Sequence, residues 1–418
     1  MTSRERVVCS LNHHQSDKVP VDFGGTMVTG ISASVVYKLR KIFKLPQHPV
    51  KIIEPYQMLG EIEDDLGKEL FVDCINIPSY TNLFGFKNED WKPWTLFDGT
   101  PVLVPAGFNT TTTSDGGIFQ FPQGDKNVPP SGFMPKDGFY FDAVKREIPP
   151  FDDENPSVED NLEEFTLFND EILRYYQEET EKLRKNTDCS LIATPGGTAL
   201  GDIALVPATF LKHPKGIRDV EEWYISLASR QEFIKELFDK QTNIALENLA
   251  LFKEAVGNKI DVLMLCGTDL GSQSGPMCSP MTFEELYLPY YKRMTSWIHA
   301  NTNWKIFKHC CGSIKPLIPK FIEAGFDILN PIQNSAIDMD PQELKDEFGS
   351  KISFWGGGVD TQHTLPFGTP DEVFKQVTQR IQIYNKNGGY VFNPIHNIQA
   401  GTPIENFLAM IDALKQFR

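Results

Sequence analysis

Short apolar runs recur along the chain, and most of them end in a glycine or a polar residue. Between most of them lie segments in which apolar residues recur every three or four positions, as they do on one face of a helix. Short buried strands that alternate with helices favour a parallel sheet. The eight runs that predict strands are Val19–Phe23, Leu70–Ile75, Ser190–Thr194, Asp261–Leu265, Lys305–His309, Phe326–Asn330, Ile352–Trp355 and Tyr390–Asn393.

Amphipathic periodicity predicts the helices of this alternation, and several begin with a Ser or Thr followed by Pro, a common helix start. Eight strand-helix units predict a (β/α)8 TIM barrel, with residues 1–418 as a single domain. An open doubly wound sheet is the alternative, but neither common glycine-rich nucleotide-binding motif of that fold occurs. The predicted helices are Val158–Lys185, Arg230–Val256, Pro280–Ala300, Ser313–Ala324, Pro370–Asn385 and Pro403–Gln416.

Residues 80–155 interrupt the alternation and are rich in proline, glycine and aromatic residues. Trp91–Phe97 and Thr100–Val104 flank Asp98-Gly99, a dipeptide typical of a β-hairpin with a type I′ turn. We therefore predict an inserted, β-rich and aromatic-rich subdomain after strand two. Because loops after barrel strands lie on the active face, this insertion is expected to cover the barrel mouth or its rim.

Composition and charge narrow the class of protein. The formal net charge of −16 argues against nucleic acid as a partner and, more weakly, against a highly anionic substrate. The chain shows neither a long apolar stretch nor a signal-like start, so no membrane association is expected. Seven scattered cysteines make a disulfide framework improbable and indicate a reducing cytoplasm. A homodimer is left open.

The stretch His309-Cys310-Cys311-Gly312 at the end of the fifth predicted strand is the strongest chemical signal. Residues two apart on a strand point the same way, so His309 and Cys311 can converge while Cys310 faces the opposite side. An imidazole nitrogen and a thiolate form half of a zinc site. The alternative is a buried histidine beside two inert thiols.

Polar residues at the other strand ends complete a candidate site at the carboxyl edge. His396 is the first choice for a third zinc ligand and Asp269 the second, whereas His363 lies further into its loop. Asp269 and Gln273 are predicted to be catalytic, by orienting the substrate or the zinc ligands. The predicted substrate-binding residues are Asp22, Asn330, Gln333 and Asn393.

Several of these motifs together resemble the uroporphyrinogen decarboxylase superfamily, and more closely its corrinoid-dependent methyltransferase branch. They are Val19–Gly25, the Asp269–Gln273 loop, His309-x-Cys311-Gly312 and Asn393-Pro-x-His396. The resemblance implies a (β/α)8 barrel that moves a methyl group to or from cobalamin. In the thiol methyltransferases of this branch, the strand-five His and Cys bind zinc together with a Cys near the last strand. This chain has His396 at that last position.

The favoured function is a zinc-dependent methyltransferase that works with a corrinoid protein and a small-molecule methyl donor or acceptor. A methoxy compound, a methylamine, a thiol and tetrahydrofolate all remain open. The chain contains no Asp-x-His-x-x-Gly cobalamin loop, so the corrinoid is expected on a partner protein. Uroporphyrinogen-type decarboxylation is an alternative, although residues 24–33 contain no Arg to bind that polycarboxylate. The third hypothesis is a non-catalytic barrel that binds a corrinoid or a metal.

Overall fold

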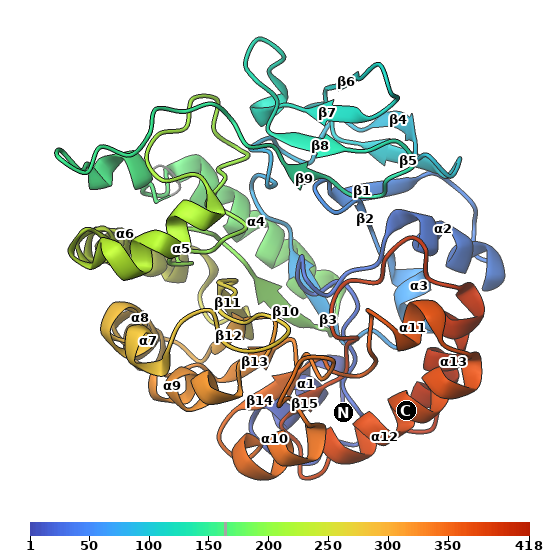
Figure 1. Cartoon of the computed structure of the whole chain (residues 1–418). Helices are drawn as coiled ribbons and strands as arrows, with labels where there is room; N and C mark the ends of the chain where they lie inside the picture. The colour runs from blue at the N-terminus through green and yellow to red at the C-terminus, as the bar shows by residue number, and fades with distance from the viewer. Residues whose placement is uncertain (163–164) are drawn as a thin grey trace.

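The computed structural model describes residues 1–162 and 165–418, and a curled parallel sheet of seven strands forms its centre (Figure 1). Each strand pairs with the next one along the chain, from β3 to β15, and all these pairs are parallel. The carboxyl ends of the strands therefore share one edge. The strands are β3 (Cys74–Ile77), β10 (Ser190–Ala193), β11 (Val262–Cys266), β12 (Lys305–His309), β13 (Ile328–Asn330), β14 (Ser353–Trp355) and β15 (Tyr390–Val391).

The first predicted strand, Val19–Phe23, contributes a single parallel bridge, between Val21 and Phe392, rather than a regular strand. Its backbone nevertheless bonds to both edges of the sheet. The N–H of Phe392 donates to the carbonyl oxygen of Pro20 (2.8 Å), and the N–H of Asp73 donates to that of Val21 (2.8 Å). Pro20 has no N–H to donate, which limits a regular ladder here. Residues 20–22 thus lie between β15 and β3.

The second predicted strand, Leu70–Ile75, was placed too early, because β3 runs over Cys74–Ile77. Leu70 instead ends helix α3 (Asp64–Glu69), and Phe71 has a positive φ of 60°. Both residues still pack on the hydrophobic core, which explains why their apolar character indicated a strand. The other six predicted strands overlap observed ones and differ at their ends by two residues or fewer.

Three predicted helices match α6 (Gln231–Val256), α12 (Pro370–Tyr384) and α13 (Ile404–Lys415). Three others are interrupted. Pro280–Ala300 breaks at Tyr287, where Pro289 prevents a continuous helix. Val158–Lys185 is a 3-10 turn followed by α4, and residues 163–164 of that prediction lie outside the described residues. The interrupted segments contain η2 (Val158–Asn161), α4 (Asp170–Asn186), α7 (Pro280–Leu286), α8 (Leu288–Asn301), η3 (Lys315–Leu317) and α9 (Ile318–Glu323).

The remaining helices had no clear signal in the sequence pattern. Among the helices of the described residues, none combines the length and apolar character that crossing a bilayer requires. The helices without a clear sequence signal are α1 (Ser3–Leu11), α2 (Ala33–Ile42), α5 (Val220–Ser229), α10 (Pro341–Phe348) and α11 (Thr364–Phe367), besides the 3-10 turn η1 (Pro122–Gly124).

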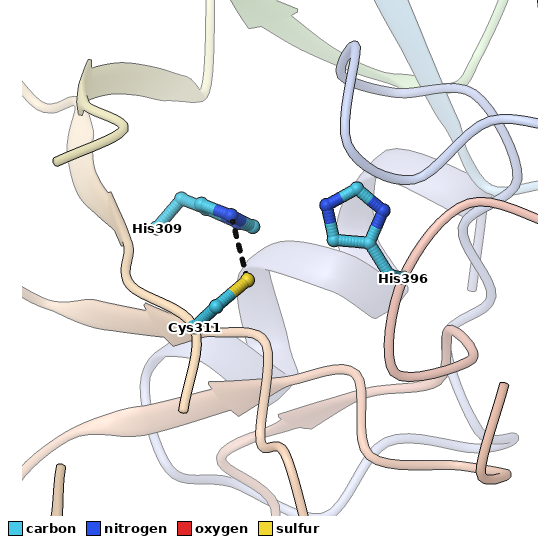
Figure 2. A group of neighbouring side chains, drawn as sticks. All are labelled: His309, Cys311 and His396. Carbon is cyan, nitrogen blue, oxygen red and sulfur yellow. Dashed lines mark hydrogen bonds between the residues drawn. The ribbon is translucent and has the colours of Figure 1, made fainter. Parts of the chain in front are cut away.

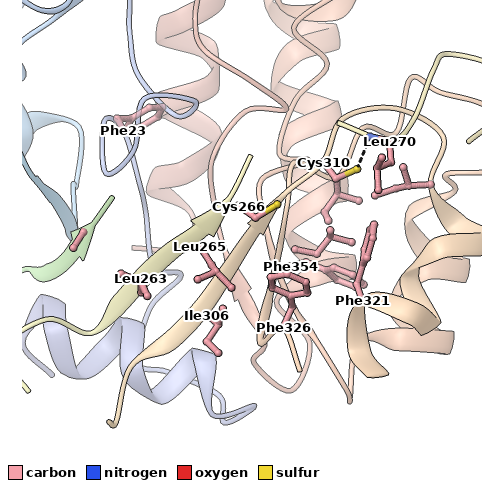
Figure 3. Close-up of a cluster of buried hydrophobic side chains, with 14 of the residues drawn as sticks. Phe23, Leu263, Leu265, Cys266, Leu270, Ile306, Cys310, Phe321, Phe326 and Phe354 are labelled. Carbon is pink, nitrogen blue, oxygen red and sulfur yellow. Dashed lines mark hydrogen bonds between the residues drawn. The ribbon is translucent and has the colours of Figure 1, made fainter. Parts of the chain in front are cut away.

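Alternate residues of the strands divide between two hydrophobic clusters. One set packs inside the curled sheet against Val7 and Leu11 of α1, so this helix covers the amino-terminal end of the sheet. The other set, including Leu263, Ile306 and Phe354, packs outward on the helices (Figure 3). The carboxyl edge is left for polar side chains. The inward set comprises Cys74, Ile192, Val262, Met264, Phe307, Ile328, Trp355 and Val391.

The predicted insertion forms two small sheets, and one of them also uses residues that precede β3. The order of the first sheet is β2-β1-β5-β4, and that of the second is β6-β7-β8-β9. The predicted hairpin is confirmed, but its turn is not type I′: Gly99 has a φ of 81°, whereas Asp98 does not have a positive φ. The strands are β1 (Val50–Glu54), β2 (Leu59–Gly60), β4 (Lys92–Thr95), β5 (Pro101–Val104), β6 (Thr110–Thr112), β7 (Ile118–Gln120), β8 (Gly132–Met134) and β9 (Asp142–Ala143).

The insertion is attached to the loop that follows β10. The hydroxyl of Thr209 in this loop donates to the carbonyl oxygen of Leu83 (2.5 Å), and the hydroxyl of Ser131 donates to that of Thr209 (2.7 Å). Since this loop leaves the carboxyl end of β10, the insertion lies on the side of the sheet where the sequence predicted it.

Candidate metal centre

His309 ends β12 with its side chain inside the curled sheet and nearly buried (4% exposed). Its Nδ1–H donates to Oδ1 of Asn330 (2.6 Å), at the end of the neighbouring strand β13. The amide nitrogen of Asn330 donates in turn to the carbonyl oxygen of Trp355 (2.8 Å), which fixes the amide orientation. The Nε2 atom of His309 therefore keeps its lone pair, and burial lowers the pKa of the ring, which favours the neutral, metal-binding form.

Cys311 lies on the same side as His309, as predicted, with Sγ 3.3 Å from Nε2 of His309 (Figure 2). Burial raises the pKa of the Cys311 thiol well above its usual range, so the thiol is protonated unless a cation stabilises the thiolate. Cys310 faces the other way, also as predicted. Its sulfur accepts the N–H of Leu270 (3.2 Å) in the outer hydrophobic cluster (Figure 3).

His396, in the loop after β15, completes a group of three potential ligands. Its ligand atom and those of His309 and Cys311 all lie within 4.8 Å of one another. The two imidazole rings are 5.5 Å apart and nearly perpendicular. Burial lowers the pKa of His396 to about 4, so this ring is neutral at physiological pH. Two imidazoles and a thiolate are a donor set that suits zinc and leaves a fourth position open.

Asp269, the second-choice ligand, lies beside this group. Its Oδ1 accepts the N–H of Cys311 (2.6 Å) and is 3.7 Å from Nε2 of His309. Lys308, fully buried on the outer side of β12, reinforces the arrangement: its ammonium donates to the carbonyl oxygens of Thr268 (2.6 Å) and His309 (2.7 Å). Lys308 was missed, although a lysine inside an apolar strand-like run was a visible signal.

Replacing Asp269 with Ala is expected to lower the affinity for metal by about 10–100-fold, the usual cost of losing a partner of a metal ligand. The reason is that the N–H of Cys311 loses its acceptor and the thiolate loses its fixed position. Competition with a chelator measures the affinity, and thermal unfolding of the metal-free proteins checks the fold. Asp269→Asn keeps an oxygen acceptor and is the control; equal affinities for all three proteins would contradict the prediction.

The other predicted residues have varied surroundings. Gln333 accepts the N–H of Gly312 on its Oε1 (2.7 Å), next to Cys311, so it supports the ligand loop. Asn393 donates to the carbonyl oxygen of Asp22 (2.9 Å), and its own buried Oδ1 has no partner within the described part of the chain. Gln273 is exposed, and Ile337 bonds to its backbone carbonyl, so its catalytic role remains a prediction.

Asp22 is fully buried and bonds within the protein. Its carboxylate accepts the indole N–H of Trp355 (2.9 Å) and the N–H of Gly25 (2.6 Å). Burial raises its pKa to about 6. These contacts join the first strand segment to β14, while its predicted contact with substrate is untested.

A cavity of about 990 Å³ lies between the loop at residues 24–30, the ends of β3 and β10, and the insertion. Within the described residues, the Oδ1 of Asn76 and the hydroxyl of Thr194 have no hydrogen-bond partner, and both residues line the cavity. Glu54 also lines it, and burial raises its pKa to about 7. Asn76 directly follows the second predicted strand, and Thr194 ends the third, so their strand-end positions could have identified them.

The cavity and the metal centre are linked through Asn397, which follows His396. The amide nitrogen of Asn397 donates to the carbonyl oxygen of Met27 (2.9 Å) and to the side chain of Gln57 (2.6 Å). Its Oδ1 accepts the N–H of Gly30 (2.5 Å). Met27 and Gly30 both line the cavity, so one short loop separates the cavity from the metal centre.

Known proteins share the fold of this chain. A methyltransferase from Methanosarcina mazei has a similar structure: the TM-score is 0.55 over 100% of this chain and 99% of that chain, at 16% identity. Uroporphyrinogen decarboxylases from three Coxiella burnetii strains are 26% identical over 161 residues. That match spans 38% of this chain and only 41% of the length of those relatives.

The family model described as uroporphyrinogen decarboxylase (URO-D) matches residues 138–417, which include β10 to β15 and all three candidate metal ligands. The Val19–Gly25 motif and most of the insertion lie outside this match. Because the match covers more than half of the chain, the protein belongs to the uroporphyrinogen decarboxylase family.

Proposed function

We propose that the protein is a zinc-dependent methyltransferase, which moves a methyl group between a corrinoid on a partner protein and a small molecule. The observation that carries this proposal is the convergence of His309, Cys311 and His396, with the Nε2 of His309 kept available by Asn330. The similar fold of a methyltransferase supports it as well. We further infer that residues 20–22 act as the eighth strand of a (β/α)8 barrel, since they bond to both sheet edges.

The residues present fit a zinc ion, since they supply nitrogen and sulfur donors. Zinc in this position would lower the pKa of a substrate thiol or hydroxyl, or polarise a methoxy oxygen. Asn330 holds the tautomer of His309, while Asp269 and Gln333 hold the backbone on either side of Cys311.

Decarboxylation is the second candidate, because the named relatives are uroporphyrinogen decarboxylases. Such a substrate carries many carboxylates and requires cations that are free to bind them. The basic side chains that line the 990 Å³ cavity already contact carboxylates of the protein. These pairs are Arg40 with Glu63 and Asp65, His48 with Glu63, Lys51 with Glu61, Lys87 with Glu171, and Lys182 with Glu179. This charge arrangement favours methyl transfer over decarboxylation.

The deciding experiment mixes the purified, zinc-loaded protein with methylcobalamin or cob(I)alamin and follows the visible spectrum of the cobalt. Methoxylated aromatics, methylamines, thiols and tetrahydrofolate serve as donors or acceptors in separate reactions. A substrate-dependent spectral change that is absent in Cys311→Ser supports the proposal. If no substrate changes the spectrum while uroporphyrinogen loses carbon dioxide, decarboxylation is the function instead.

Two tryptophans of the insertion should respond differently to truncation. Trp91 lines the cavity, with the ammonium of Lys51 5.7 Å from its ring, whereas Trp94 packs against Phe108 (ring centroids 5.3 Å apart). Trp91→Ala is therefore expected to raise the KM for the small molecule with little change in Tm. Trp94→Ala should lower the Tm, since Trp94 packs partly buried against the hydrophobic core and such a side chain contributes on the order of 1 kcal/mol. Steady-state kinetics and thermal unfolding separate the two, and a lower Tm for Trp91→Ala alone would contradict the assignment.

A further inference from the structure

The two histidines of the metal centre have opposite hydrogen-bonding partners. The Nδ1 of His309 faces an acceptor, Oδ1 of Asn330, and so carries the proton. The Nδ1 of His396 faces a donor instead, because the backbone N–H of Asn397 donates to it (2.8 Å). In a neutral imidazole one nitrogen is a donor and the other an acceptor. His396 therefore carries its proton on Nε2, the nitrogen on the side of His309 and Cys311 (Figure 2).

This tautomer opposes coordination by His396. To bind a metal through Nε2, the ring must move its proton to Nδ1, where it would meet the N–H of Asn397. Rotating the ring by half a turn about its Cβ–Cγ bond does not help. That rotation places Cδ2 where Nδ1 was and Cε1 where Nε2 was. A ligating histidine normally donates its second N–H to an acceptor, as His309 does and His396 does not.

The N–H of Asn397 has little freedom to move away. The side chain of Asn397 bonds to Gly30, Met27 and Gln57, and the residue is 1% exposed. The next residue, Ile398, forms a parallel bridge with Ile31. The donor that faces His396 is thus held by contacts on both sides of the peptide.

We propose that His396 is the exchangeable ligand of the centre: His309 and Cys311 anchor the metal, and His396 is the ligand that a substrate atom replaces. When not bound to a metal, His396 would keep the bond from Asn397 and would present Nε2–H towards His309 and Cys311 (Figure 2). This inference rests on the proposed zinc site. It also separates this chain from the thiol methyltransferases of the resemblance, which have a Cys near the last strand. A Cys thiolate has no tautomer to change, whereas His396 does.

The first test reads the tautomers in the metal-free protein by NMR with 15N-labelled histidine, in which eight histidines give few signals. Loss of a signal in His396→Gln or His309→Gln assigns each ring. The expected result is a proton on Nε2 of His396 and on Nδ1 of His309. A proton on Nδ1 of His396 would overturn the proposal, whatever the activity of the protein.

The second test ranks zinc affinities by competition with a chelator. His396→Gln and His396→Ala should each lose less than about tenfold, whereas His309→Ala should lose more than about 100-fold, above the range typical for partners of ligands. An equal loss for His396 and His309 overturns the exchangeable ligand alone. If the unaltered protein binds no zinc, the proposed function fails with it. Because the tautomer is read without metal, these two failures are distinguishable.

Discussion

Cys311→Ser and His309→Ala should each abolish stoichiometric zinc and, with it, methyl transfer. Both side chains converge on one point, with Sγ and Nε2 3.3 Å apart. Asn330 bonds to the ring of His309, and Asp269 accepts the N–H of Cys311. Losing a ligand should cost more than the 10–100-fold that losing its supporting partner costs. Elemental analysis of the purified proteins and chelator competition measure the effect, and zinc binding should weaken at acid pH because the thiol must release a proton.

Cys310→Ser is the matched control, since it changes the adjacent thiol with the same chemistry. Cys310 is fully buried in the outer cluster and accepts the N–H of Leu270, so it points away from the centre. It should retain zinc and turnover, with at most a modest loss of stability. If Cys310→Ser loses zinc and Cys311→Ser keeps it, the alternation along this strand end has been misassigned.

The pairing of His309 and Cys311 could be predicted from the sequence because it depends on strand geometry. The two-residue spacing of His309 and Cys311 places them on one side of any extended segment, and a predicted parallel sheet brings the later strand ends to the same edge. What the pattern could not predict is hydrogen-bond polarity. Asn330 and Asn397 are both amides beside strand ends, yet one meets its histidine through a side-chain acceptor and the other through a backbone donor.

The fold was predicted least well where apolar residues serve packing rather than pairing. Leu70 and Phe71 indicated a strand, but they end α3 and pack behind the sheet. The insertion was expected to be contiguous, whereas β1 comes from residues before β3 and pairs in parallel with β5. Such a long-range parallel pairing leaves no local signal, because its register depends on where the rest of the fold brings the two segments.

Asp73 is expected to have the largest effect on stability, because its fully buried carboxylate joins the two ends of the chain to the sheet. It accepts hydrogen bonds from Arg6 (2.7 Å), Arg418 (2.6 Å) and the N–H of Val21 (3.0 Å). Asp73→Ala leaves Arg6 in a largely buried position without this partner. Removing one member of a buried ion pair costs about 3–5 kcal/mol, so the free energy of unfolding should fall by that order.

Asp17→Ala is the control, because Asp17 contacts the same guanidinium of Arg6 (2.9 Å) but its side chain is 34% exposed. Because water reaches the Asp17 carboxylate, losing this contact should cost only about 1 kcal/mol. Chemical denaturation of the metal-free proteins compares the two variants without involving the metal centre. Equal changes in the free energy of unfolding for the two variants would show that the position of Asp73 between Val21 and β3 does not matter. A much larger fall in the free energy of unfolding for Asp73→Ala would show that this carboxylate stabilises the segment that lies between β15 and β3.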